Sequence, residues 1–117
     1  MARPYFWQHE EIKEINMTRY RKHKEHLIEK LKNSEYAAAY LTAALEESYD
    51  CSDPSLFQVA VRDVVEARGG VGAISAQMDV NRESFYRSLS SKGKVRFSTL
   101  INAIKACGFD LEFHPAH

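Results

Sequence analysis

The chain has 117 residues, 44% of them hydrophobic, which fits one small domain, or one domain plus an arm. Lys and Arg balance Asp and Glu at 16 each, and this zero net charge argues weakly against nucleic-acid binding. No apolar run is long enough for a transmembrane helix or a signal peptide, and the two distant cysteines, Cys51 and Cys107, are typical of free thiols in a reducing, cytoplasmic compartment.

Residues 1–16 differ from the rest of the chain. Tyr5, Phe6 and Trp7 lie together, and few capping residues follow them. Two interpretations stay open. These residues are either an extension, disordered or docked on a partner through its aromatic side chains, or they precede the true start at Met17.

Two helices are expected over residues 17–52, which we interpret as an N-terminal region that binds a partner. The first, over 18–31, has a narrow apolar face made by Leu27, Ile28 and Leu31. Asn33-Ser34 then provides a break and a cap. Residues 36–47 are rich in Ala and favour a helix strongly, and residues 48–52 are expected to form a loop.

The region 53–117 is expected to form a helix-turn-helix domain with a C-terminal strand. It opens with Asp53-Pro54, where Asp suits the N-cap and Pro the first helical position. Apolar residues then recur at the helical period, at Leu56, Phe57, Ala60, Val61, Val64 and Val65. Gly69-Gly70 ends this helix, and Arg68 suits the dipole at its C-terminal end.

Residues 72–89 predict two short helices joined by a tight turn. Ile74 and Met78 lie one helical turn apart, the pattern breaks at Asp79, and Phe85 and Leu89 again lie four apart. A short helix, a three-residue turn and a second short helix with a polar, basic outer face is the helix-turn-helix arrangement. The second helix would then lie in the major groove of DNA.

The start of this second helix has its own signals. Asn81 is a good N-cap, because its side-chain oxygen can accept a backbone N–H that has no partner in the helix. Val80 before the cap and Phe85 within the helix are spaced as a hydrophobic staple.

The last part of the chain combines a helix and a strand. After a basic loop over 90–95, Ser98 is the expected cap of a helix that ends at Gly108. The tail alternates apolar Phe109, Leu111 and Phe113 with polar residues, as a strand does. A lone strand must pair, so we expect these three residues to dimerise two copies. The predicted fold is therefore all-α, with five to six short helices, a lambda-repressor-like helix-turn-helix and a short C-terminal β-strand that pairs across a dimer.

The neutral net charge hides regions of opposite sign. Basic residues dominate 81–96, and a second basic cluster covers 19–24. The middle of the chain is acidic, with Glu46, Glu47, Asp50, Asp53, Asp63 and Glu66 and only Arg62 to oppose them. A basic region suits DNA, and an acidic one suits a basic partner.

Several of these blocks, in this order, resemble the addiction-module antidote family, the HigA-like antitoxins of the Xre helix-turn-helix class. The resemblance covers roughly residues 17–114. Its main blocks are Asp53-Pro-Ser-Leu-Phe, Val59-Ala-Val-Arg-Asp-Val-Val-Glu-Ala-Arg-Gly, the turn motif, Leu89-Ser-Ser-Lys-Gly, Arg96-Phe-Ser-Thr-Leu and Ala106-Cys-Gly-Phe-Asp-Leu. The chain departs at Ser75, where the family usually has Ala, and at Asp79, where it usually has Gly. Asp tolerates the left-handed backbone better than most residues, so the turn should survive.

The resemblance implies a small cytoplasmic dimer that represses its own operon and neutralises a RelE- or HigB-like toxin, a small ribonuclease encoded beside it. The operator would be a palindrome that receives two recognition helices about 34 Å apart. The N-terminal helices and the acidic middle would face the toxin, which should be basic. Two alternatives stay open: a stand-alone Xre-type repressor without a toxin, and a protein-interaction module that no longer binds DNA.

The expected DNA contacts lie on the outer face of the second motif helix and in the loop after it. Arg can read guanine and Asn adenine, whereas the basic residues past the helix suit phosphates. The DNA-binding residues predicted are Gln77, Asn81, Arg82, Glu83, Ser84, Tyr86, Arg87, Lys92, Lys94 and Arg96. Ser75 is a weaker candidate. Asn81 is less free to read a base if it caps the helix.

Nothing in the sequence predicts an enzyme. It contains no P-loop, no Gly-rich phosphate motif and no nucleophile arrangement. His23 and His26 lie three apart, but no Cys or carboxylate completes a ligand set. We therefore expect no catalysis, no metal and no cofactor.

Overall fold

The computed structural model describes residues 22–90 and 94–116, and every regular element in these ranges is a helix. A helical segment over 22–31 is followed by α2 (Ser34–Asp50), α3 (Ser55–Ala67), α4 (Gly70–Met78), α5 (Arg82–Ser90) and α6 (Phe97–Ala106). The all-α prediction is confirmed. Within the described ranges no helix is both long and apolar enough to cross a membrane.

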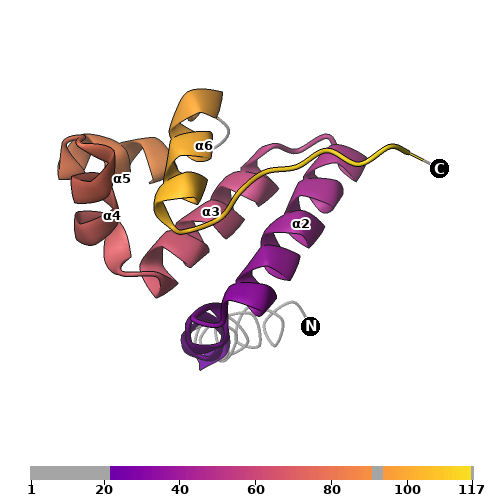
Figure 1. Ribbon diagram of the computed structural model, residues 1–117, viewed down its shortest axis with the longest axis horizontal. Coiled ribbons are helices and arrows are strands. Elements are labelled where there is room, and N and C mark those ends of the chain that lie inside the picture. Colours follow the sequence, from indigo (N-terminus) through magenta and orange to yellow (C-terminus); the bar gives the residue numbers. More distant parts are fainter. Residues whose placement is uncertain (1–21, 91–93, 117) are drawn as a thin grey trace, which may run out of the picture.

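Helix α3 lies at the centre of the fold. It contacts α2, α4, α5 and α6, with α2 on one side of it and α4 and α5 on the other (Figure 1). The predicted apolar stripe of α3 forms the middle of the core, where Val61, Val64 and Val65 are at most 1% exposed. Ile74 of α4 and Phe85 of α5 are buried in the same core, so the packing of α3 fixes the position of the α4–α5 pair.

Three helices end in the same hydrogen-bonded turn. A residue with a positive φ lies two positions past the ends of α2 and α6, at Ser52 and Gly108, and one position past the end of α4, at Asp79. After α2, the N–H of Asp53 donates to the carbonyl of Ser48 over 2.9 Å and that of Ser52 to Tyr49 over 3.3 Å. This pair of bonds is the Schellman pattern, which satisfies the last carbonyls of a helix.

Two predicted helix boundaries are wrong by a few residues. Helix α2 continues to Asp50 through part of the expected loop, because the buried hydroxyl of Ser48 donates to the carbonyl of Asp53 over 2.6 Å and holds the last turn closed. Helix α6 begins at Phe97 with Arg96 as its N-cap and no side-chain cap bond, so the expected cap at Ser98 is not used.

The cap predicted at Asn33 is confirmed, because its side-chain oxygen accepts the backbone N–H of Tyr36 over 2.9 Å. The start predicted for α3 is wrong by one residue. The helix begins at Ser55 with Pro54 as its N-cap and no side-chain cap bond, and Asp53, one residue earlier, accepts the backbone N–H of Ser55 over 3.1 Å.

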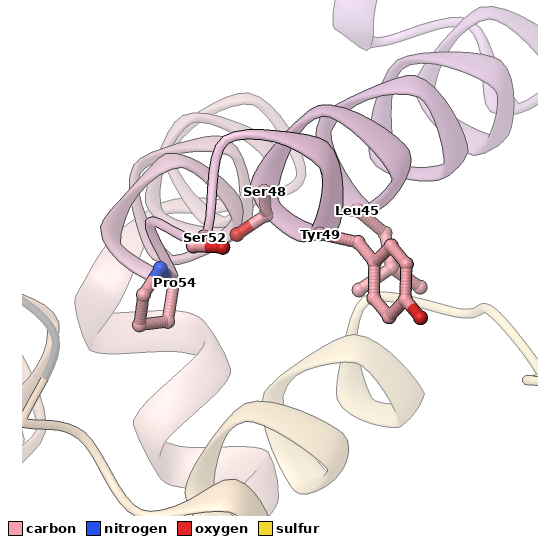
Figure 2. Close-up of a pocket in the computed structure, with 5 residues that line it drawn as sticks. All are labelled: Leu45, Ser48, Tyr49, Ser52 and Pro54. Carbon is pink, nitrogen blue, oxygen red and sulfur yellow. The ribbon is translucent and has the colours of Figure 1, made fainter.

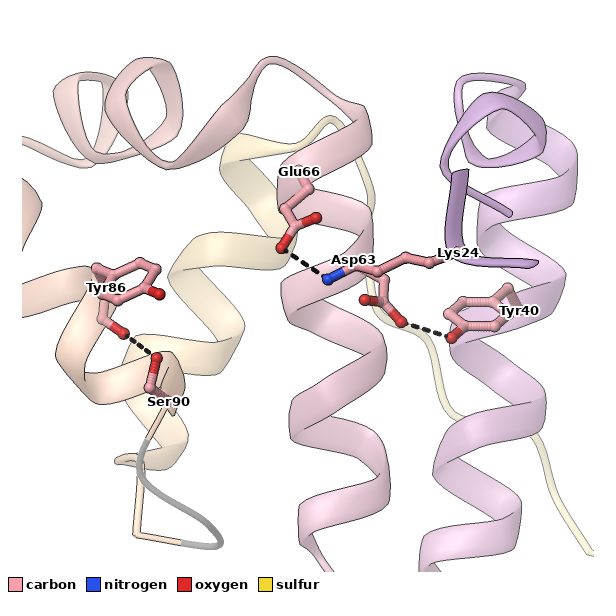
Figure 3. A network of polar contacts seen from close by, with 6 residues as sticks. All are labelled: Lys24, Tyr40, Asp63, Glu66, Tyr86 and Ser90. Carbon is pink, nitrogen blue, oxygen red and sulfur yellow. Dashed lines mark hydrogen bonds and ion pairs between the residues drawn. The ribbon is translucent and has the colours of Figure 1, made fainter. Parts of the chain in front are cut away.

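A polar network joins the N-terminal helices to α3 (Figure 3). The Tyr40 hydroxyl of α2 donates to the Asp63 carboxylate over 2.9 Å, and Lys24 forms an ion pair with Glu66 over 3.4 Å. Burial raises the pKa of the Asp63 carboxyl, and the Tyr40 bond, Lys24 and Arg62 offset part of that rise. One lysine of the predicted N-terminal basic cluster is therefore engaged within the protein.

Arg68 ties four segments together at the other end of α3. Its guanidinium donates to the carbonyl of Lys32 over 3.1 Å, to the hydroxyl of Ser34 over 3.0 Å and to the carbonyl of Cys107 over 3.3 Å. It also lies 5.1 Å from the centre of the Phe109 ring. Arg68, which was predicted to suit the C-terminal end of α3 by its charge, therefore also joins the ends of the 22–31 segment and of α6.

The predicted C-terminal strand is not found in the described residues. Residues 109–116 carry no regular secondary structure and run back past α3 (Figure 1). A strand needs the N–H and C=O groups of a neighbouring strand, and a single helical chain offers none. Phe109 instead packs against the core of its own chain.

Candidate nucleic-acid interface

The turn between α4 and α5 is closed by backbone hydrogen bonds. Asp79 has φ 57° and ψ 46°, so the prediction that it accepts the left-handed conformation is confirmed. Its N–H donates to the carbonyl of Ala76 over 3.2 Å, and the N–H of Val80 donates to Ser75 over 3.0 Å. These bonds fix the direction in which the chain leaves α4 and therefore how α5 is presented.

Asn81 caps the start of α5, as predicted. Its side-chain oxygen accepts the backbone N–H of Ser84 over 2.9 Å. That oxygen is engaged in the helix, which leaves the amide nitrogen of Asn81 as the group that can reach outward. Val80 is 45% exposed, so the proposed staple with the buried Phe85 shields only part of its side chain.

The two faces of α5 differ in exposure as the sequence predicts. Phe85 and Leu89 are each 2% exposed and face the core. The side chains predicted to contact DNA on α5 and at its start are all exposed, namely Asn81, Arg82, Glu83, Ser84, Tyr86 and Arg87. Gln77 at the end of α4 is exposed too. Ser75 is only 2% exposed and donates its hydroxyl to the carbonyl of Gly72 over 3.0 Å, so it is removed from the candidates.

Arg82 lies back against α4. Its Nε atom would be 3.7 Å from a Cβ atom placed on Gly72. Together with Glu83, Tyr86 and Arg87 of α5, Glu66 of α3 and Val71 of α4, it lines a shallow open pocket. This pocket is therefore a surface of mixed charge. Arg87, which also lines it, is the basic residue in the last turn of α5.

The basic residues after α5 are only partly described. Lys94 and Arg96 are exposed, and Arg96 adopts an extended backbone directly before α6. Lys92 lies outside the described residues. Exposed cations next to the end of α5 are placed as phosphate contacts would require.

Sequence reasoning missed Gln58, which positions α5 from a distance. This α3 residue is 2% exposed, and its amide donates to the carbonyls of Leu89 over 2.9 Å and Ser88 over 3.3 Å. It thereby satisfies carbonyls at the end of α5 that no helical N–H can reach. The sequence contained one signal for this role: Gln58 is an amide residue within the otherwise apolar stripe of α3.

The predicted dimerisation residues fall into two groups. Phe109 is half-buried against its own subunit, whereas Leu111 is 44% and Phe113 98% exposed. Only the latter two are free to meet a second copy. Among the described residues no three His, Cys, Asp or Glu side chains gather into a group that could hold a metal ion.

Comparison with known proteins identifies the family. A family model described as "Probable addiction module antidote protein" matches residues 12–115. No curated protein and no solved structure matches the chain. The match spans most of the chain and includes every described helix. The chain therefore belongs to the probable addiction module antidote protein family.

Proposed function

We propose that this protein is the antitoxin of a type II toxin–antitoxin module. In the cytoplasm it binds and neutralises a RelE- or HigB-like toxin and, as a homodimer, represses its own operon by binding a palindromic operator. Membership of the antidote family supports the neutralising role. The observation that supports DNA binding is the α4–α5 pair, with a closed turn, a capped second helix and an exposed polar outer face.

In this proposal α4 and α5 form a helix-turn-helix and α5 is the recognition helix. Two copies of α5 enter successive major grooves, about 34 Å apart. Arg87 reads a guanine, the amide of Asn81 and the side chains of Ser84 and Tyr86 line the groove, and Lys94 and Arg96 contact phosphates. Gln58 is a positioning residue, because it holds the end of α5 without reaching the DNA surface.

The DNA part is tested with Arg87→Ala, measured against the chain's own promoter. We expect operator affinity to fall about 5- to 150-fold, as for the loss of a bidentate base contact. Lys30→Ala, an exposed residue outside the proposed interface, is the matched control and should bind as the wild type does. Unchanged affinity of the Arg87 variant at moderate salt would remove this residue from the interface.

The same titration at several salt concentrations separates the repressor from a module that has lost DNA binding. Neutralised phosphates release counterions, so a DNA-binding domain loses affinity steeply as salt rises. Weak binding without salt dependence would favour the interaction module.

The toxin part is tested by growth. The small reading frame beside this gene is expressed alone and then together with this protein. Arrest that this protein relieves supports the antitoxin. No arrest, or arrest without rescue, favours the alternative, a stand-alone Xre-type repressor.

A further inference from the structure

An apolar groove lies at the end of α2, and none of the residues that line it belongs to α5. It is lined by Leu45, Ser48, Tyr49, Ser52 and Pro54 and has a volume of about 640 Å³ (Figure 2). Tyr49 is 86% exposed and Leu45 is 49% exposed. These two lie one turn apart and continue the buried Leu41 face of α2 out into solvent. A large, nearly free tyrosine beside a leucine is the composition typical of the centre of a protein interface.

The chain segment that forms the groove carries charge of a single sign, and we call its exposed acidic residues Glu46, Glu47 and Asp50 the rim. Between Lys32 and Arg62 the sequence holds five acidic residues and no Lys, Arg or His. Glu46, Glu47 and Asp50 flank Tyr49 on α2 and are exposed, and none of the ion pairs found in the described residues involves them. A partner surface with positive charge would therefore complement the rim.

These acidic residues are badly placed for the helix that carries them. The C-terminal end of a helix favours cations, and α2 has no basic residue in its last turn. Glu47 and Asp50 lie in that turn instead. No ion pair within the described residues compensates for this placement, and a local rule broken without compensation is expected at functional sites.

The walls of the groove are fixed before any partner arrives. Ser52 is held at φ 53° by the closing turn of α2, and the Ser48 hydroxyl donates to the Asp53 carbonyl over 2.6 Å. Pro54 restricts the backbone that follows. A groove that needs no ordering loses less conformational entropy on binding.

Resting on the antitoxin function proposed above, we propose that this groove is the toxin-binding site. It takes a bulky apolar side chain that a basic protein surface presents. The charge excludes nucleic acid as the occupant. A second copy would meet it through a self-complementary contact that brings two acidic rims together, which is repulsive. The groove is lined by residues of α2 and of the turn before α3 and by none of the residues predicted to contact DNA, so in this proposal the toxin leaves the DNA surface free.

The test uses the full chain and the purified product of the neighbouring small reading frame. Tyr49→Ala removes the apolar anchor and should weaken binding about tenfold or more. The triple variant Glu46→Lys, Glu47→Lys and Asp50→Lys reverses the rim and should slow association about tenfold or more at low salt, with a smaller effect at high salt.

Matched controls separate the groove from general effects. Tyr36→Ala changes an exposed tyrosine at the other end of the same helix. A second triple variant, Glu25→Lys, Glu29→Lys and Glu35→Lys, changes the net charge equally at exposed sites on the 22–31 segment and at the other end of α2. Both should bind within about twofold of the wild type, since surface charges outside an interface contribute little.

Thermal unfolding supplies an independent readout. Because the rim variant places lysines at the C-terminal end of α2, it should unfold at the same temperature as the wild type or a higher one. Weaker toxin binding by a protein of equal or higher stability cannot result from misfolding.

The outcomes distinguish the assignment of the groove from the antitoxin function on which it rests. If the neighbouring product arrests growth and this protein rescues it, but both groove variants bind and rescue as the wild type does, the groove assignment is overturned and the antitoxin function stands. If the product is not toxic, the antitoxin function fails and this site fails with it. A change of oligomeric state in the groove variants, measured by light scattering, would assign the groove to a second copy and overturn the proposal.

Discussion

At the scale of single residues, the ends of α2 and α4 depend on side chains held at positive φ. Ser52 has φ 53° and Asp79 has φ 57°, whereas the equivalent position after α6 is a glycine, Gly108, with φ 98°. The left-handed conformation brings the Cβ atom close to the following carbonyl oxygen, and glycine avoids that contact. The chain thus retains a small backbone strain at two places: at Asp79, in the turn before α5, and at Ser52, in the wall of the groove.

Asp79→Gly should therefore stabilise the protein. We expect the free energy of unfolding to rise by about 0.5–1 kcal/mol, because relief of strain exceeds the added freedom of the unfolded chain. Urea denaturation of the two proteins measures it. Asp79→Val, a β-branched residue at the same φ, should instead destabilise, and the reverse order of the two variants would contradict the interpretation.

Asp63 makes stability depend on pH. Its pKa is raised by burial, so the folded state binds a proton more tightly than the unfolded chain does. Stability is then greatest below the unfolded pKa and falls as pH rises through the folded pKa. Asp63→Asn keeps an acceptor for the Tyr40 hydroxyl and removes the buried charge.

The expected result is that Asp63→Asn unfolds at a higher temperature than the wild type at pH 7 and that this advantage vanishes as pH falls to about 4, the ordinary range of an aspartate. Thermal melts across this range measure the difference. Asp63→Ala, which leaves the Tyr40 hydroxyl without this acceptor, is the contrasting variant and should destabilise at both pH values. An advantage that grows toward acid would show that the charged form is the stabilised one.

At the scale of elements, α3 organises the molecule through two long side chains as well as through its apolar stripe. Gln58 holds the end of α5, and Arg68 joins the ends of the 22–31 segment and α6. Both side chains donate to helix-terminal carbonyls, which have no partner within their own helix. Single side chains thus connect α5, which carries the candidate DNA surface, and the N-terminal segments to α3.

Arg68→Ala should destabilise the protein by about 2–4 kcal/mol, because charged hydrogen bonds to several carbonyls are lost together. Arg68→Lys should recover little, since an ammonium group cannot reproduce the planar fork of donors. Chemical denaturation measures both, with Arg96→Ala as an exposed control. Full recovery by lysine would mean that charge alone, without the fork geometry, carries the contribution.

At the scale of the whole molecule, the C-terminal tail offers a surface that the described part of the chain leaves exposed. Leu111 and Phe113 are exposed, but Phe109 packs on Arg68. Truncation after Gly108 should weaken dimerisation, yet it also removes the contact of Phe109 within the subunit. The double variant Leu111→Ser and Phe113→Ser isolates the exposed pair.

We expect the double variant to shift the protein toward monomers in light scattering while its melting temperature stays near that of the wild type at high dilution. The physical reason is that burial of these exposed apolar side chains against a second subunit would stabilise the dimer. Dimers of unchanged strength in both the truncated and the doubly substituted protein would discard the tail as the dimer contact.

Local patterns in the sequence were enough for the helices and for the α4–α5 turn. The apolar period of α3, the caps at Asn33 and Asn81 and the breaks at Asp79 and Gly108 involve residues within one or two helical turns of each other. Such local interactions do not depend on how the helices pack. Once Phe85 and Leu89 were predicted to face the core, the helical period predicted which residues of α5 are exposed. The exposed candidates on α5 were predicted for this reason.

Only the tertiary structure decided how these segments meet. Gln58 reaches carbonyls 30 residues away, Arg68 reaches one 39 residues away, and neither partner is marked by any local pattern. The groove at the end of α2 arises where a helix end, a turn and the next helix come together. The tail shows the opposite case: its alternation predicted a strand, but strand formation depends on a backbone partner that one copy of the chain does not supply.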